Sequence, residues 1–127
     1  MANEIKINLS ISVSKNGAKY ERQESFSDDM TGDAWATGIA DITATGETLV
    51  ADTDVGTYGW VFVKNLTSSG TTYIDIIHTD SGGDDSDDTL CRLYVGESTI
   101  FKTAGKTALY ADSSSGTQRL EYALIEL

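Results

Sequence analysis

The stretch Tyr58–Ile77, YGWVFVKNLTSSGTTYIDII, decides the fold class of this chain. Its first part, Tyr58–Leu66, is the densest run of aromatic and β-branched residues in the sequence, and its last part, Thr71–Ile77, is again rich in Thr, Tyr and Ile. These residue types favour strands, whereas Thr67-Ser68-Ser69-Gly70 between the two parts are turn formers. The pattern predicts a β-hairpin at the centre of an all-β domain.

A period of two recurs along the rest of the chain, and no 11-residue window shows a convincing helical period. The clearest alternation runs from Ile5 to Val13, where every second residue is apolar. It predicts a half-buried strand with one face on the core and the other in water. Lys15-Asn16-Gly17 is a turn signal, and Lys19–Phe26 follows as a more polar edge strand, so the two strands are expected to form a first hairpin.

Further strands are predicted at intervals of about eight to twelve residues. They span Trp35–Ala44, Thr48–Ala51, Thr89–Val95, Ser98–Lys102, Thr107–Ala111 and Gln118–Glu126. Tight turns are expected at Gly96-Glu97 and at Ala104-Gly105-Lys106. About nine or ten short strands, with no internal repeat and no linker, predict a single antiparallel β-sandwich or jelly-roll-like domain over residues 1–127.

The charge of the chain excludes some classes of partner. Nine basic against twenty acidic residues give a formal net charge of −11, which opposes binding to nucleic acid and to anionic membranes. The amino-terminal segment has no cationic region followed by an apolar one, and no run approaches the length of a membrane span. We therefore expect no secretory signal, no membrane contact and no nucleic-acid partner.

No motif in the sequence points to catalysis. His78 is the only histidine, and no nucleophile elbow accompanies the many serines and aspartates that could complete a triad with it. Glu97 and Glu121 are candidates for paired carboxylates only by elimination, and ordinary turn and surface roles account for both. Cys91, the single cysteine, lies in an apolar run and is expected to be a buried small hydrophobe, not a reactive thiol. The chain is predicted not to be an enzyme and to need no cofactor.

An acidic loop is the one candidate for a metal site. It follows His78 and contains Asp80, Asp84, Asp85, Asp87 and Asp88. Ca²⁺ takes about six to eight oxygen ligands, but this loop lacks the glutamate at the twelfth position of an EF-hand. We favour a solvated, charged loop, with Ca²⁺ as the alternative; Asp52 and Asp54 would join such a site only if the fold brings the loops together.

Aromatic residues stand on many of the predicted strands: Trp35, Tyr58, Trp60, Tyr73, Tyr94, Tyr110 and Tyr122. Exposed aromatic rings can stack on sugars, but rings on strands more often belong to a core or a protein interface. Trp60 lies in the most apolar run and is predicted to be in the core. The candidate residues for contact with a partner are Ile5, Ile7, Trp35, Tyr58 and Tyr94.

From Gly59 to its end the chain resembles a group of small all-β virion proteins of tailed bacteriophages. The resemblance rests on the order of short motifs: a strand closing on Lys64-Asn65-Leu66, then Thr72-Tyr73-Ile74, an acidic loop, Arg92-Leu93 with Gly96-Glu97 and Phe101, and Leu109-Tyr110-Ala111 ahead of Leu120-Glu121-Tyr122. Members of the group have an asparagine immediately before the tyrosine, where this chain has Thr72.

The resemblance implies a non-enzymatic structural protein of the virion, assembled in the host cytoplasm. Its role would be that of a head decoration (cement) protein that binds and stabilises the outer capsid surface, or of a tail component. The expected partners are the major capsid protein or other virion proteins and further copies of the chain, with a trimer as the expected oligomer. Ala2–Val13 and the aromatic-bearing strands are candidate contact regions.

The alternative function is a tail-tip or carbohydrate-binding adhesion module. Trp35 and the tyrosines would then serve as stacking platforms for sugars, with Ca²⁺ bound at the acidic loop.

Overall fold

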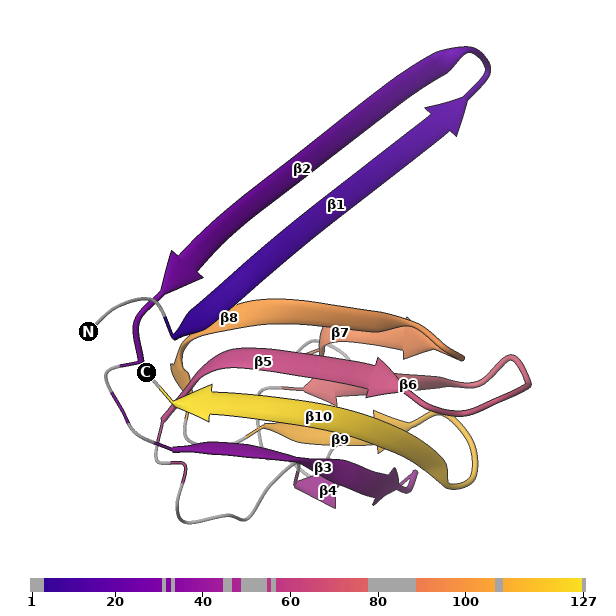
Figure 1. The fold of residues 1–127 in the computed structure, drawn as a ribbon. Coiled ribbons are helices and arrows are strands. Elements are labelled where there is room, and N and C mark those ends of the chain that lie inside the picture. The colour runs from indigo at the N-terminus through magenta and orange to yellow at the C-terminus, as the bar shows by residue number, and fades with distance from the viewer. Residues whose placement is uncertain are drawn as a thin grey trace. The chain divides into compact units, whose positions relative to one another are not determined.

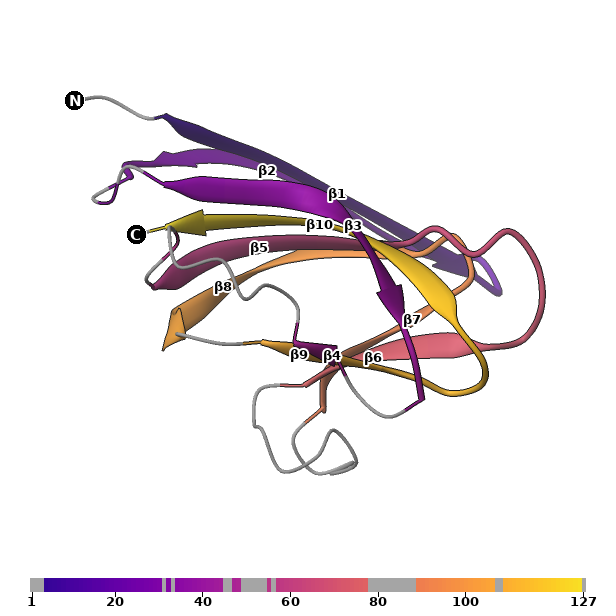
Figure 2. The same ribbon diagram turned by 90° about the horizontal axis from the view of Figure 1, so that it is seen from below.

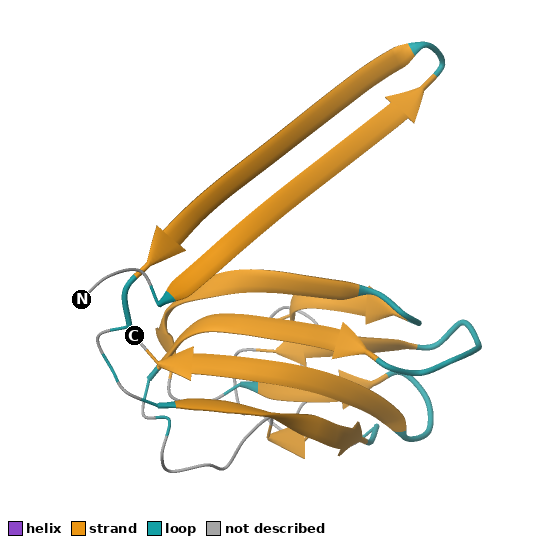
Figure 3. Ribbon diagram, viewed as in Figure 1, coloured by secondary structure: helices purple, strands orange, loops and turns teal. Residues whose placement is uncertain are grey.

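The computed structural model describes residues 4–30, 32, 34–44, 47–48, 55, 57–77, 89–106 and 109–126. These residues form ten strands and no helix, which confirms the predicted all-β class (Figures 1 and 3). The chain divides into two compact units, Met1–Thr31 and Gly32–Leu127. The single sandwich domain was predicted over residues 1–127, whereas both four-stranded sheets are built by the second unit, because the two strands of the first unit pair only with each other.

The first unit is a long hairpin of β1 (Ile5–Lys15) and β2 (Ala18–Asp28), which we call the arm. The two strands pair antiparallel along their whole length, from Ile5 opposite Asp28 to Lys15 opposite Ala18. Asn16 and Gly17 form the turn with φ of 53° and 82°. Positive φ at both central residues is the geometry of a type I′ turn, which Asn-Gly favours. The predicted first hairpin is therefore confirmed.

The second unit contains two antiparallel sheets, seen as two layers in Figure 2. The strand order of the first sheet is β3-β10-β5-β8, with bounds β3 (Trp35–Ile42), β10 (Gln118–Glu126), β5 (Tyr58–Asn65) and β8 (Ser98–Lys106). The strand order of the second sheet is β4-β9-β6-β7, with bounds β4 (Glu47–Thr48), β9 (Tyr110–Ser113), β6 (Tyr73–Ile77) and β7 (Thr89–Tyr94).

A single apolar core lies between the two sheets. Its buried members are Ile42, Val55, Val61, Val63, Ile74, Ile76, Leu93, Leu109, Ala111, Leu120 and Leu124. Among the strands whose side chains are described, all but β8 contribute at least one of these residues. From β8, Phe101 packs against the cluster. The predicted antiparallel β-sandwich is thus confirmed for residues 32–126.

The prediction that Tyr58–Ile77 is a hairpin is wrong. Its two strands exist, but β5 pairs with β10 and β8, whereas β6 pairs with β9 and β7. Residues 66–72 carry the chain from one sheet to the other, and this length is ample for the roughly 10 Å between packed sheets. The crossing lets both strands bury their apolar faces in the same core.

Two other sequence predictions need correction. The turn expected at Ala104-Gly105-Lys106 is absent from the described backbone, because β8 continues to Lys106, which pairs with Tyr58 after a shift of register. The strand expected at Thr107–Ala111 begins later, at Tyr110. Trp60 is buried as predicted, at 7% exposure, but it lies on the face of β5 opposite Val61 and Val63, where the Lys102 ammonium is 5.5 Å from its ring centre.

Candidate functional site

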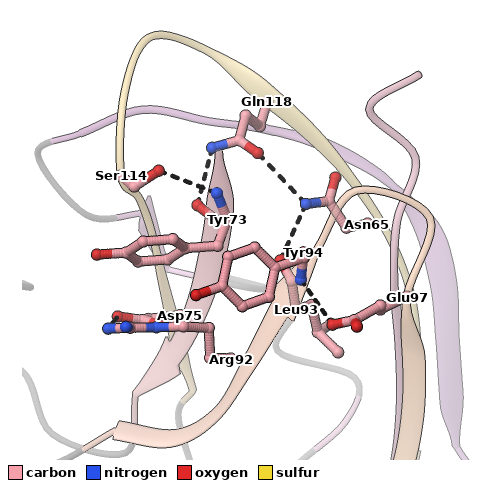
Figure 4. Close-up of polar contacts among 9 residues, drawn as sticks. All are labelled: Asn65, Tyr73, Asp75, Arg92, Leu93, Tyr94, Glu97, Ser114 and Gln118. Atoms are coloured by element: carbon pink, nitrogen blue, oxygen red, sulfur yellow. Dashed lines mark hydrogen bonds and ion pairs between the residues drawn. The ribbon is translucent and has the colours of Figure 1, made fainter. Parts of the chain in front are cut away.

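One end of the sandwich is held by a buried polar cluster (Figure 4). Asn65 is fully buried at the end of β5, and its side-chain amide donates to the Leu93 carbonyl at 3.1 Å and to the Gln118 side-chain oxygen at 3.3 Å. The Gln118 amide in turn donates to the Tyr73 carbonyl at 2.8 Å and to Ser113 Oγ at 2.6 Å. Buried polar groups of this kind need partners, so the cluster fixes β5, β6, β7, β9 and β10 to one another.

Glu97 belongs to the same end and has a structural role. Its backbone NH donates to the Tyr94 carbonyl at 3.0 Å, and its carboxylate accepts from the Tyr94 NH at 2.8 Å. Gly96 between them has φ of 79°, which closes the predicted tight turn. These contacts support the turn role that the sequence favoured for Glu97. Glu121 lies on β10 opposite Lys64 and Ile39, in the middle of the first sheet.

A ladder of aromatic and charged side chains crosses β6 and β7, with its β6 members partly buried and its β7 members exposed. Tyr73 lies opposite Tyr94, and Asp75 lies opposite Arg92. The Arg92 guanidinium binds the Asp75 carboxylate through two bonds of 2.8 and 2.9 Å and lies 3.8 Å from the centre of the Tyr73 ring. The Tyr94 ring meets Tyr73 edge-on, with ring centres 5.5 Å apart. Tyr94, a predicted contact residue, is thus exposed but already packed against Tyr73.

Cys91 has the environment of an inert thiol. It packs against the core from β7, and burial raises the pKa of its thiol to about 11, with a further contribution from the negative charge of Asp75. A thiol must lose its proton to act as a nucleophile. The structure therefore supports the interpretation of Cys91 as a small hydrophobe.

The arm presents an apolar face to solvent. Two residues that pair across β1 and β2 point to the same face of the arm. The odd-numbered residues of β1 therefore share one face with the even-numbered residues of β2. Five apolar side chains on this face are between 43% and 57% exposed: Leu9, Ile11, Val13, Tyr20 and Phe26. We call these five residues the arm face. The opposite face of the arm is polar, with Lys19 bound to Glu21 at 2.9 Å and Ser25 bound to Asn8 at 2.7 Å.

This exposure corrects the prediction for the amino-terminal strand. Ile5 and Ile7, two of the predicted contact residues, are 6% and 4% exposed. The remainder of the strand was predicted to be half-buried, but its apolar side chains face solvent. The sequence carried one signal of this arrangement, because the alternation over Ile5–Val13 is longer than the usual strand of about five or six residues.

The outer face of the first sheet carries a second apolar surface. Trp35 and Ile39 of β3 are 66% and 58% exposed. The register places Ile125 beside Trp35, and Ala123 between Thr37 and Phe62. We call the surface formed by Trp35, Ile39, Phe62, Ala123 and Ile125 the β3 patch. It includes a hollow of about 250 Å³, which is smaller than the roughly 300–1,000 Å³ of small-molecule sites. Among the predicted contact residues whose side chains are described, Trp35 is thus the most exposed.

Several predicted site residues lie outside the described residues. These are His78, Asp52, Asp54 and the five aspartates Asp80, Asp84, Asp85, Asp87 and Asp88. Tyr58 belongs to β5, but its side chain is also outside the description. Among the side chains that are described, no three or more His, Cys, Asp or Glu residues gather as metal ligands. The Ca²⁺ alternative for the acidic loop stays a prediction.

Replacing Asn65 by Leu is expected to lower the free energy of unfolding by about 2–3 kcal/mol, because it leaves the buried acceptors on Leu93 and Gln118 without their donor. Urea unfolding followed by tryptophan fluorescence measures this loss. Ser68→Ala, an exposed change in the neighbouring connection, serves as the control and is expected to shift the midpoint little. Equal midpoints for Asn65→Leu and the wild type would contradict the role assigned to the cluster.

Alkylation of Cys91 by iodoacetamide at pH 8 is expected to be about 100-fold slower in the folded protein than in guanidinium, because its pKa is about 11 instead of the ordinary 9.0. The folded-state rate should continue to rise between pH 9 and pH 11. Stability should fall over the same interval, since the unfolded thiol ionises first. A folded-state rate that levels off near pH 9 would show that the thiol is open to water.

Comparison with known proteins identifies no relative. No protein-family model matches the chain, and neither a curated protein nor a solved structure matches it significantly. In the described part of the chain, no helix is long and apolar enough to cross a membrane.

Proposed function

We propose that this chain is a non-enzymatic structural protein of a tailed-phage virion, a decoration (cement) protein that binds the outer surface of the head and stabilises it. One observation supports this proposal more than any other: each of the two units of this 127-residue chain has exposed apolar side chains, those of the arm face and those of the β3 patch. Contiguous exposed apolar surface commonly marks a site of protein–protein contact. Two such surfaces suit a subunit that touches two neighbours, as a protein that bridges positions on a shell must do.

The arrangement of the strands supports the same proposal. We propose that the sandwich is a jelly roll, because its eight strands lie in two sheets of order β3-β10-β5-β8 and β4-β9-β6-β7, so that most successive strands alternate between sheets. Jelly rolls occur among viral capsid proteins and also among lectins. The fold is therefore compatible with decoration and with sugar binding, and the choice between them depends on the surface residues.

The charge of the chain suits a subunit that stays dispersed until it meets its shell. A net charge of −11 keeps free copies apart through long-range repulsion. On a capsid, each subunit adds one contact to many identical ones, so that a modest affinity at each position still stabilises the whole shell.

The adhesion alternative is supported by one specific observation, the high exposure of Trp35. A flat indole ring open to solvent is suited to stacking on the apolar face of a sugar. Such stacking depends on the ring itself, whereas a protein interface on the β3 patch depends on the whole apolar surface. Ile39 belongs to the β3 patch but has no ring on which a sugar could stack. Replacing Ile39 should therefore weaken a protein interface on the β3 patch and leave sugar stacking on Trp35 unchanged.

Purified protein is expected to cosediment with undecorated heads of its phage, saturating at a fixed ratio to capsid subunits. Trp35→Ala and Ile39→Ser should each weaken this binding at least about tenfold, as changes in the centre of an interface do. Leu90→Ser is the matched control, because Leu90 is an exposed apolar residue of β7, in the other sheet. No binding to heads, together with glycan binding that Trp35→Ala abolishes and Ile39→Ser spares, would replace decoration by adhesion.

A further inference from the structure

We propose that the arm face is covered by the arm face of a second copy of this chain, with the two arms stacked face to face and running in opposite directions. The contact is a property of the free protein, so it can be tested without the capsid. In this proposal the arm face serves self-association, and the β3 patch stays available for another partner.

The first argument is the order of charges along the arm face. On this face Asp28 and Glu24 lie toward the base of the arm, opposite Ile5 and Leu9, whereas Arg22 lies nearer the tip, opposite Ile11. Lys15 ends the same face at the tip. The face is therefore acidic at one end and basic at the other. Only the antiparallel arrangement of two arms brings unlike ends together.

The second argument is the match of side-chain types in that arrangement. A two-fold axis across the strands, at the level of Ser10, stacks β1 on β1 and β2 on β2 of the second copy. Leu9 then faces Ile11, Arg22 faces Glu24, and Tyr20 faces Phe26. The parallel arrangement stacks β1 on β2 and places Leu9 on Glu24 and Ile11 on Arg22, which would cover charges with aliphatic side chains. The same axis brings Val13 to the level of Ile7, and Lys15 and Ala18 to the level of Ile5 and Asp28.

The third argument is the charge of the arm compared with the rest of the chain. The arm, residues 5–28, contains four basic and three acidic residues, whereas Gly32–Leu127 contains five basic and fifteen acidic residues. Two copies therefore repel each other least through their arms. The Arg22–Glu24 pair lies at 2.6 Å with both side chains at least half exposed, so it can rearrange into a cluster with the same pair of a second copy.

The area of the contact sets its strength. Five half-exposed apolar side chains offer on the order of 80–120 Å² each, which gives about 800–1,200 Å² for two arms together. This lies at or below the lower limit of stable interfaces. We therefore expect a reversible dimer with a dissociation constant of about 10–100 μM, formed when copies are concentrated.

Sedimentation velocity over about 5–500 μM protein tests the contact, and it should show a monomer giving way to a dimer as concentration rises. Arg22→Glu and Glu24→Arg should each weaken the homodimer at least about tenfold, because like charges then meet across the two-fold axis. Lys19→Glu is the matched control, with the same change of charge on the polar face of the arm, and it should alter the dissociation constant less than about threefold.

A mixture of the Arg22→Glu and Glu24→Arg variants gives the decisive measurement. Each variant alone has like charges at both positions, but in a mixed dimer every position faces its opposite charge. The mixture should regain dimer, whereas damage confined to the fold of a single arm would not be repaired by mixing. A wild-type protein that stays monomeric throughout, a trimer, a dimer indifferent to Arg22→Glu, or a mixture with no recovery would each overturn the antiparallel arm contact.

Discussion

The structure of the sandwich depends on one contact, that between the apolar inner faces of its two sheets. Val61 and Val63 of β5 meet Ile74 and Ile76 of β6 in a single core, and all four side chains are fully buried. The hydrophobic effect grows with the area removed from water, so this contact outweighs the tendency of a short polar connection to pair neighbouring strands. It is the reason that two strands adjacent in the sequence lie in different sheets.

Crossing between sheets creates a second requirement, because carbonyl groups at the strand ends beside the crossings are buried and need donors. Asn65 donates to the Leu93 carbonyl, and Gln118 donates to the Tyr73 carbonyl, which also accepts from the Ser114 NH. The polar cluster is therefore a consequence of the topology. Asn65 and Tyr73, which belong to the short motifs singled out in the sequence, have structural roles here, and the exposed apolar surfaces lie elsewhere.

Prediction from the sequence succeeded where a pattern encodes a local property. The alternation in Ile5–Val13 encodes an extended strand, and Asn16-Gly17 encodes its turn, so the arm could be predicted. The same alternation does not encode what covers the apolar side chains, and the exposure of Leu9 and Ile11 was therefore missed. Pairing of β5 with β6 was predicted wrongly for a similar reason, since residues 67–70 permit a turn within a sheet or a crossing between sheets.

The arm shows why an exposed apolar face and a strongly acidic chain can occur together. A two-stranded ribbon alone is only marginally stable in water, so its apolar face gains from being covered. In the proposed decoration role, strong self-association in solution would compete with placement on a shell, and the net charge of −11 opposes such self-association at long range. Copies held side by side by a common partner have a high effective concentration, at which a contact too weak to persist in dilute solution becomes occupied. In the proposed decoration role, weak, complementary arms would therefore join subunits after they are placed on the shell, and not before.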